Sequence, residues 1–382
     1  MKKYILSIIT LLLILIGCST DDSGIEDIDG NNPDSDLIGN VFNRENMLIN
    51  WADNIILPGY NSFLSTLKVL NNSFENLKSE GTAAALQDFK EKWLLSYKEW
   101  QHVSMFEIGP AEEIGYRLQM NTYPADRELI ESNIISASYN FELPSTRDAK
   151  GFAALDYILN GINSNDTDLL NTLTQNQDSS KYIQYIEDII ADMSSQTNYV
   201  IDTWNGSYRD SFIANSGSSA SASVDKFVND FIYYYEKHLR AGKMGIPLGV
   251  FLGSPAPQTI EVYYSPEQSK IMFLEGLNAV QDFFNGVHYN SNQSGESLAS
   301  YLTALESIKG SQNLADLINE KFDIAREAVD ALGSFKSEIE LNNPPTNMLM
   351  AYDKVQSIVP LFKVDMISAM SINIDYVDAD GD

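Results

Sequence analysis

Charged side chains gather where a strongly apolar helical pattern is interrupted by glycine and proline. The segment 100–110 ends in Gly109-Pro110, a pair that must stop or kink a helix. Arg117 lies four residues after Glu113, so these two side chains can pair on one face of a new helix. A helix break flanked by a cation and carboxylates often lines a binding site. We therefore expect a ligand site around this break.

Two later segments add carboxylates to the candidate site. A second break at 121–126 ends in Asp126. In segment 150–159, Ala153 and Asp156 are three residues apart and share one face of the expected helix. Asp156 could accept hydrogen bonds or contribute to a metal site built from several oxygens, with an ion pair between helices as the alternative.

A further segment, 243–251, is an apolar loop that contains Pro247 between two glycines. It follows a helix pattern that ends in Lys-His-Leu-Arg. His238, Arg240 and Lys243 could form part of a small pocket for an anion or a carboxylate.

Other metal and catalytic patterns are weak. Glu99 and His102 have the E-x-x-H spacing of di-iron bundles, but those proteins need two such motifs, so a surface ion pair is favoured. The sequence contains no H-E-x-x-H, no glycine-rich phosphate loop and no G-x-S-x-G elbow. These absences exclude the common zinc-peptidase, nucleotide-binding and serine-hydrolase signatures.

The composition excludes several classes of protein. The 382 residues include 25 Lys and Arg against 53 Asp and Glu, a formal charge of −28 that argues against a nucleic-acid partner. The hydrophobic content of 44% is too high for a disordered chain. A single cysteine excludes an internal disulfide framework, a cysteine zinc cluster and an iron–sulfur site.

The N-terminus has the pattern of a bacterial lipoprotein. Two lysines precede an apolar run, and residues 1–17 are therefore interpreted as a signal peptide that ends before Cys18. Lipidation of Cys18 would anchor the chain to a membrane, whereas an ordinary signal peptide with an incidental cysteine is the alternative. Residues 18–40 are polar and acidic and predict a flexible tether. We expect an outer-membrane lipoprotein, on the periplasmic side or at the cell surface.

Apolar residues at helical spacing predict an all-α protein from about residue 41 onward. A Gly/Ser/Ala-rich stretch at 214–223 divides the expected bundles into lobes near 41–205 and 224–375, with a cleft between them. The last residues, 376–382, predict a frayed acidic tail.

Four sequence blocks, in this order, resemble the imelysin family, which is also classed as peptidase family M75. They are FEIGP at 106–110, GFAALDYIL at 151–159, KMGIPLG at 243–249 and EVYYS at 261–265. The resemblance spans most of residues 43–375. It implies an all-helical domain of 41–375 with two bundle-like lobes around a cleft, and an association with iron-regulated uptake.

The family's hallmark is a G-x-H-x-x-E motif, which aligns with Gly151, Ala153 and Asp156. The histidine is replaced by alanine and the glutamate by aspartate, so neither a catalytic role nor a strong metal site is expected, apart from Asp156 as a candidate oxygen ligand. This resemblance and the spacing above imply a role for each kind of residue. Glycine and proline shape the backbone of the site, and Arg117 and Lys243 hold an anionic group of the ligand. Asp156 and Glu261 supply oxygen atoms to the site. The full set of expected ligand-binding residues is Phe106, Gly109, Pro110, Arg117, Asp126, Gly151, Ala153, Asp156, Lys243, Pro247, Glu261 and Ser265.

Three functions are compatible with this sequence. The first is an envelope binding component linked to iron or metal acquisition, with iron or another divalent metal as a possible cofactor. The second is a metallopeptidase of the M75 type, against which Ala153 argues. The third is a structural accessory of an outer-membrane transporter without a small ligand.

Overall fold

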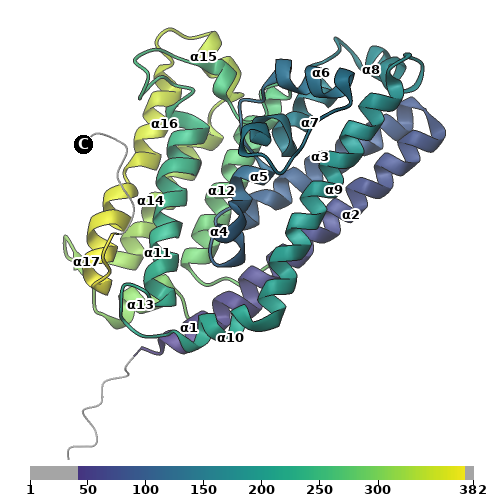
Figure 1. Ribbon diagram of the computed structural model, residues 1–382. Helices are drawn as coiled ribbons and strands as arrows, with labels where there is room; N and C mark the ends of the chain where they lie inside the picture. Colours follow the sequence, from purple (N-terminus) through teal and green to yellow (C-terminus); the bar gives the residue numbers. More distant parts are fainter. Residues whose placement is uncertain (1–41, 375–382) are drawn as a thin grey trace, which may run out of the picture. The chain divides into compact units, whose positions relative to one another are not determined.

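Helices make up nearly all the regular structure of residues 42–374, the part of the chain that the computed structural model describes (Figure 1). The two short strands in this part, β1 (Ile308–Lys309) and β2 (Gln312–Asn313), pair antiparallel in one small hairpin. The expected all-α class is therefore confirmed. None of the helices in 42–374 is both long and apolar enough to cross a bilayer. The signal peptide, Cys18, the tether and the tail 376–382 lie outside the described residues.

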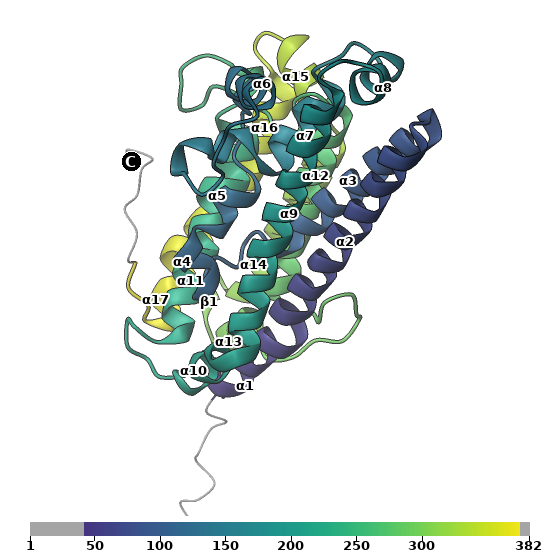
Figure 2. The same cartoon turned by 45° about the vertical axis from the view of Figure 1, so that its right-hand side comes forward.

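Three long helices dominate the first half of the chain. After α1 (Arg44–Asn50) and the π-helix η2 (Trp51–Ile56), α2 (Leu57–Glu80) packs along both α3 (Ala83–Val103) and α9 (Ser179–Thr203) (Figure 2). Gly81, with φ of 60°, ends α2 in the left-handed region, and the Thr82 side chain caps α3. These two residues turn the chain tightly enough for α2 and α3 to lie antiparallel.

Shorter helices between α3 and α9 carry five of the twelve expected site residues, and two more, Gly109 and Asp126, cap them. In chain order they are α4 (Pro110–Ile114), α5 (Tyr116–Met120), α6 (Arg127–Ser136), the 3-10 helix η3 (Pro144–Ala149), α7 (Gly151–Asn160) and α8 (Asp166–Thr174). Both expected breaks, at Gly109-Pro110 and at 121–126, separate successive helices.

The second half begins after η4 (Trp204–Tyr208) and α10 (Arg209–Ala214). α11 (Ser223–Tyr233) continues directly into a long π-helix, η5 (Tyr234–Gly245). The remaining elements are η6 (Pro257–Thr259), η7 (Pro266–Gln268), α12 (Ser269–Phe284), α13 (Leu298–Ala304), α14 (Leu314–Asp330), α15 (Phe335–Glu340), α16 (Thr346–Gln356), η8 (Leu361–Met366) and α17 (Ile367–Met370). α14 packs against both α12 and α16.

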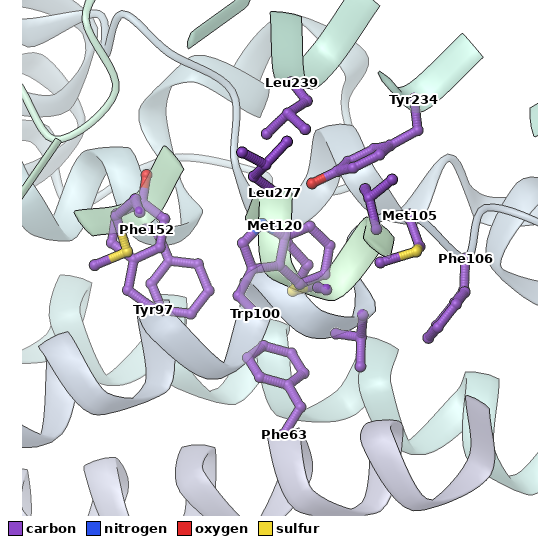
Figure 3. Close-up of a cluster of buried hydrophobic side chains, with 14 of the residues drawn as sticks. Phe63, Tyr97, Trp100, Met105, Phe106, Met120, Phe152, Tyr234, Leu239 and Leu277 are labelled. Atoms are coloured by element: carbon purple, nitrogen blue, oxygen red, sulfur yellow. The ribbon is translucent and has the colours of Figure 1, made fainter. Parts of the chain in front are cut away.

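The two halves meet in a core rich in aromatic residues, and α3 packs against α12 at this junction. Figure 3 shows Phe63, Tyr97, Trp100 and Phe152 from the first half near Tyr234, Leu239 and Leu277 from the second. The rings of Tyr97 and Phe152 stack with centroids 4.4 Å apart. Residues 42–374 belong to one compact unit with a shared core. The division of this domain into lobes near 41–205 and 224–375 stays a prediction.

Candidate functional site

The backbone at Gly109 shapes the first part of the site. Gly109 has φ of 52°, and α4 begins at Pro110. The ring of Tyr208 lies so close that a Cβ at Gly109 would be 2.0 Å from Tyr208 Cζ. Glycine is therefore required here both for the backbone conformation and for the contact with the ring.

A second glycine, Gly115, separates α4 from α5 and corrects one sequence-based expectation. Its φ of 61° ends α4, so Glu113 and Arg117 lie on different helices and do not pair. Glu113 accepts a hydrogen bond from the Tyr199 hydroxyl instead. The i,i+4 rule fails here because it applies only within one continuous helix.

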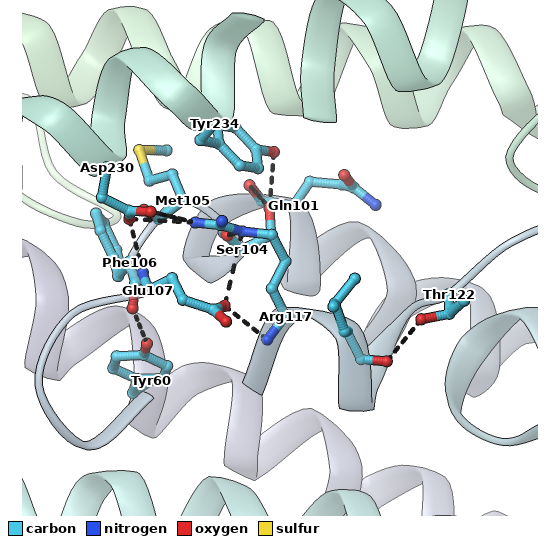
Figure 4. Close-up of polar contacts among 11 residues, drawn as sticks. Tyr60, Gln101, Ser104, Met105, Phe106, Glu107, Arg117, Thr122, Asp230 and Tyr234 are labelled. Carbon is cyan, nitrogen blue, oxygen red and sulfur yellow. Dashed lines mark hydrogen bonds and ion pairs between the residues drawn. The ribbon is translucent and has the colours of Figure 1, made fainter. Parts of the chain in front are cut away.

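The Arg117 side chain is buried in a cluster with two carboxylates, Glu107 and Asp230, which we call the Arg117 cluster (Figure 4). Its Nη2 donates to both oxygens of Asp230, at 3.2 and 3.1 Å, and its Nε donates to the Ser104 carbonyl at 2.7 Å. The Glu107 carboxylate accepts the backbone N–H of Arg117 at 2.7 Å. The Arg117 guanidinium also lies 5.2 Å from the ring centroid of Tyr234. The ion pair of Arg117 and Asp230 thus joins α5 to α11, and it is largely shielded from water.

Burial changes the protonation of both carboxyls in this cluster. It raises the pKa of Glu107 to about 7 and that of Asp230 to about 6. The positive charge of Arg117 opposes both shifts in pKa, whereas the nearby carboxylate of Glu112 adds to them. The pKa of His238 is lowered well below its usual range by burial and by Arg117 and Lys243, so its imidazole is neutral at pH 7.

An open groove of about 680 Å³ lies beside the Arg117 cluster, and we call it the Gly109 groove. Its walls come from the Gly109 break, α4, α5, η4, α10, α11 and the start of η5. Four aromatic side chains and six charged or titratable ones line it: Tyr208, Phe212, Phe227 and Tyr233, with Glu107, Glu112, Arg117, Lys226, Asp230 and His238. Its size falls within the range of small-molecule sites.

A second buried polar network, the Lys243 cluster, consists of Gln101, Asn121, Lys243 and Glu261. Lys243 Nζ pairs with Glu261 and donates to Gln101 Oε1 at 2.7 Å. Asn121 Nδ2 donates to Glu261 Oε1 at 2.7 Å, and Asn121 Oδ1 accepts from the Tyr97 hydroxyl. Burial lowers the pKa of Lys243, while the neighbouring Glu261 opposes that change. This cluster links α3, the α5–α6 loop and η5 to the segment that precedes α12.

The hallmark segment forms the start of α7. Gly151 has φ of 69°, and a Cβ there would lie 2.1 Å from the Met120 carbonyl oxygen, so only glycine fits. Asp156 is buried and accepts hydrogen bonds from Asn160 Nδ2 and from the backbone N–H of Tyr264, at 3.1 and 2.9 Å. Burial raises the pKa of Asp156 to about 6, and hydrogen bonds, including one from Ser265, oppose that rise. Asp156 thus ties α7 to the EVYYS segment.

The expected site residues therefore fall into separate groups. Gly109 and Arg117 line the Gly109 groove, with Phe106 packed in the aromatic core behind it and Pro110 beginning α4. Gly151, Ala153, Asp156 and Ser265 lie around α7, while Lys243 and Glu261 form their own buried pair.

Two expected residues belong to none of these groups. Pro247 is buried in the loop after η5, and Asp126 caps α6 by accepting a hydrogen bond from the Leu129 N–H. Arg117 and Lys243, the two cations expected to hold an anionic group, already pair with carboxylates of the protein.

Metal binding at Asp156 finds no support in the donor set. Ala153 carries no donor atom, and both oxygens of Asp156 accept hydrogen bonds from the protein. Within 42–374, no three His, Cys, Asp or Glu side chains are grouped so that they could hold a metal ion. His102 Nε2 lies 3.4 Å from Glu275 Oε2, so its carboxylate neighbour is Glu275 and not the Glu99 of the E-x-x-H spacing.

Comparison with known proteins agrees with the helical architecture. The family model described as imelysin, peptidase M75, matches residues 56–360. The chain belongs to the imelysin family. Thus the resemblance seen in its four sequence blocks is confirmed.

Two solved structures share the fold. A protein described as an iron-regulated protein A precursor, from Parabacteroides distasonis, is 16% identical, with a TM-score of 0.67 over 85% of this chain and 95% of that one. An imelysin-like protein from Psychrobacter arcticum is 15% identical, with a TM-score of 0.68 over 89% of this chain and 100% of that one. Iron-regulated protein A of Synechococcus elongatus is 26% identical over 109 residues, which cover 28% of this imelysin-family chain and 30% of that relative.

Proposed function

We propose that this chain is a lipid-anchored binding component of the cell envelope, which captures a ligand in the Gly109 groove as part of iron acquisition. The groove itself carries this proposal. It has the volume of a small-molecule site and aromatic walls, and at its base lie the buried Arg117 and the partly buried carboxylates of Glu107 and Asp230. Such a combination offers both apolar contact area and a few polar groups that fix the orientation of a ligand.

The link to iron rests on relatives. A curated relative and one structural neighbour are both described as iron-regulated protein A. Iron, or a small molecule that accompanies iron uptake, would be cargo in this proposal, since the described residues offer no grouped set of three metal donors.

The envelope location rests on the N-terminal sequence. Lipidation of Cys18 would tether the domain to the outer membrane, facing the periplasm or the cell surface, where a transporter could receive the ligand. A peptidase function is less well supported. Peptide hydrolysis needs a water molecule activated by a metal and a general base. Ala153, which stands where the family motif has histidine, can neither bind a metal nor take up a proton.

Filling the groove should test this function in cells. Ser211 lies on α10, is exposed and lines the groove, so Ser211→Trp would place an indole there. Asn205 is exposed on η4 and is not among the groove residues, which makes Asn205→Trp the matched control. We expect cells that lack this chain to grow poorly under iron limitation, and the wild-type chain and Asn205→Trp to restore growth.

Ser211→Trp should fail to restore growth although it accumulates to the same level in the membrane fraction. Full restoration by Ser211→Trp would refute the role of the groove. Normal growth of the cells that lack the chain would refute the link to iron.

A further inference from the structure

The carboxylates of the Gly109 groove are only partly used within the protein. Glu107 Oε2 accepts the backbone N–H of Arg117, whereas Glu107 Oε1 has no hydrogen bond with any described residue. Glu112 is exposed at the edge of the groove, and its carboxylate makes no hydrogen bond or ion pair with residues 42–374. Two acceptor groups therefore face the groove without a donor.

The cations of the groove do not neutralise these carboxylates. Arg117 is buried, and its Nε and Nη2 donate to Ser104, Met105 and Asp230. His238 is neutral because its pKa is lowered. Above the raised pKa values of Glu107 and Asp230, which are about 7 and about 6, three carboxylates thus face two cations, of which only Lys226 is exposed to solvent. In a site of reduced dielectric, this excess of negative charge favours a positively charged ligand.

The aromatic walls favour the same class of ligand. The Tyr208 ring covers the backbone at Gly109, and Phe212, Phe227 and Tyr233 are the other aromatic residues that line the groove. The negative faces of aromatic rings attract cations and also pack against flat or apolar groups. A metal ion would instead need several oxygen, nitrogen or sulfur ligands. In the described part of the chain, no three His, Cys, Asp or Glu side chains come together to supply them.

We propose that the Gly109 groove binds an organic cation, in which an ammonium or guanidinium group pairs with Glu107 and an apolar body lies against Tyr208 and its aromatic neighbours. This inference rests on the proposed function, since it names the chemical class of the ligand that the groove captures. It also reverses the expectation of an anionic ligand, because Arg117 already has Asp230 as its partner.

Calorimetric titration of the full chain in detergent with two matched probes tests this inference. The probes are 2-phenylethylammonium and 3-phenylpropanoate, which share a phenyl ring and a short linker but differ in the sign of their charge. We expect the cation to bind, and Glu107→Gln to weaken its binding about tenfold or more, since hydrogen bonds to charged groups are about twice as strong as neutral ones. Glu113→Gln, which removes a carboxylate outside the groove, should leave the affinity unchanged.

Three results would overturn the inference: tighter binding of 3-phenylpropanoate, cation binding that Glu107→Gln leaves unchanged, or no binding of either probe up to about 10 mM. Circular dichroism of Glu107→Gln shows whether the variant is folded, and Glu107→Ala gives a second test if it is not. If the cation fails to bind but Ser211→Trp still abolishes growth, the class of ligand is wrong and the groove function stands. If Ser211→Trp restores growth, the proposed function itself fails.

Discussion

Replacing Arg117 with methionine should destabilise the folded domain by about 3–5 kcal/mol, the usual cost of removing one partner from a buried ion pair. Arg117 is only 6% exposed, and its guanidinium is the cation closest to both Glu107 and Asp230. Methionine fills a similar volume but leaves two partly buried carboxyls without their cation. Urea denaturation at neutral pH would measure the loss in the free energy of unfolding.

A partly exposed arginine provides the matched control for this experiment. Arg209 pairs with Asp53 and Asp210, but its side chain is about one third exposed, so Arg209→Met should cost about 1 kcal/mol or less. The double variant Arg117→Met/Asp230→Leu should recover part of the loss, because it removes the uncompensated carboxylate along with the cation. An equal effect of Arg117→Met and Arg209→Met would contradict the importance of the Arg117 cluster.

Neutralising Glu107 should stabilise the domain in a manner that depends on pH. Its pKa is raised to about 7 in the folded chain, above the value of about 4.3 expected in an unfolded chain. The protonation of Glu107 therefore adds its full contribution to the free energy of unfolding below about pH 4, and this contribution is lost as the pH rises toward about 7. Glu107→Gln keeps the shape of the protonated side chain and has no proton to lose, so it avoids that loss.

We expect the stability of Glu107→Gln relative to the wild type to increase by about 2–3 kcal/mol between about pH 5 and about pH 7.5. His238 acts in the opposite direction, because its lowered pKa costs stability as the pH falls. Its effect is present in both proteins and largely cancels in the comparison. Denaturation curves at both pH values measure the difference, and a difference that does not change with pH would show that Glu107 is ionised normally in the fold.

Local sequence patterns were sufficient to predict the helical architecture. Apolar spacing predicts helices from about residue 41 onward, and Gly109-Pro110 marks a true break between helices. These features depend on neighbours within a few residues of the chain. The four family blocks, likewise, could be recognised without any knowledge of their contacts.

The partners within the site could not be predicted in the same way. Asp230 lies 113 residues after Arg117, and no local pattern connects them. One signal was present, because Asp230 is an isolated acid in the apolar run FVNDFIYYY, and such an acid needs a buried partner. The assumed pair of Glu113 and Arg117 failed because the left-handed conformation of Gly115 cannot be read from the spacing of the charges.

The most direct test of a ligand-binding groove is native mass spectrometry of the full chain purified from its own membranes after growth under iron limitation. The wild-type protein and Asn205→Trp should each carry one additional small-molecule mass, and Ser211→Trp should lack it. The same mass on Ser211→Trp, or no additional mass on the wild-type protein, would contradict the assignment of the Gly109 groove as the binding site.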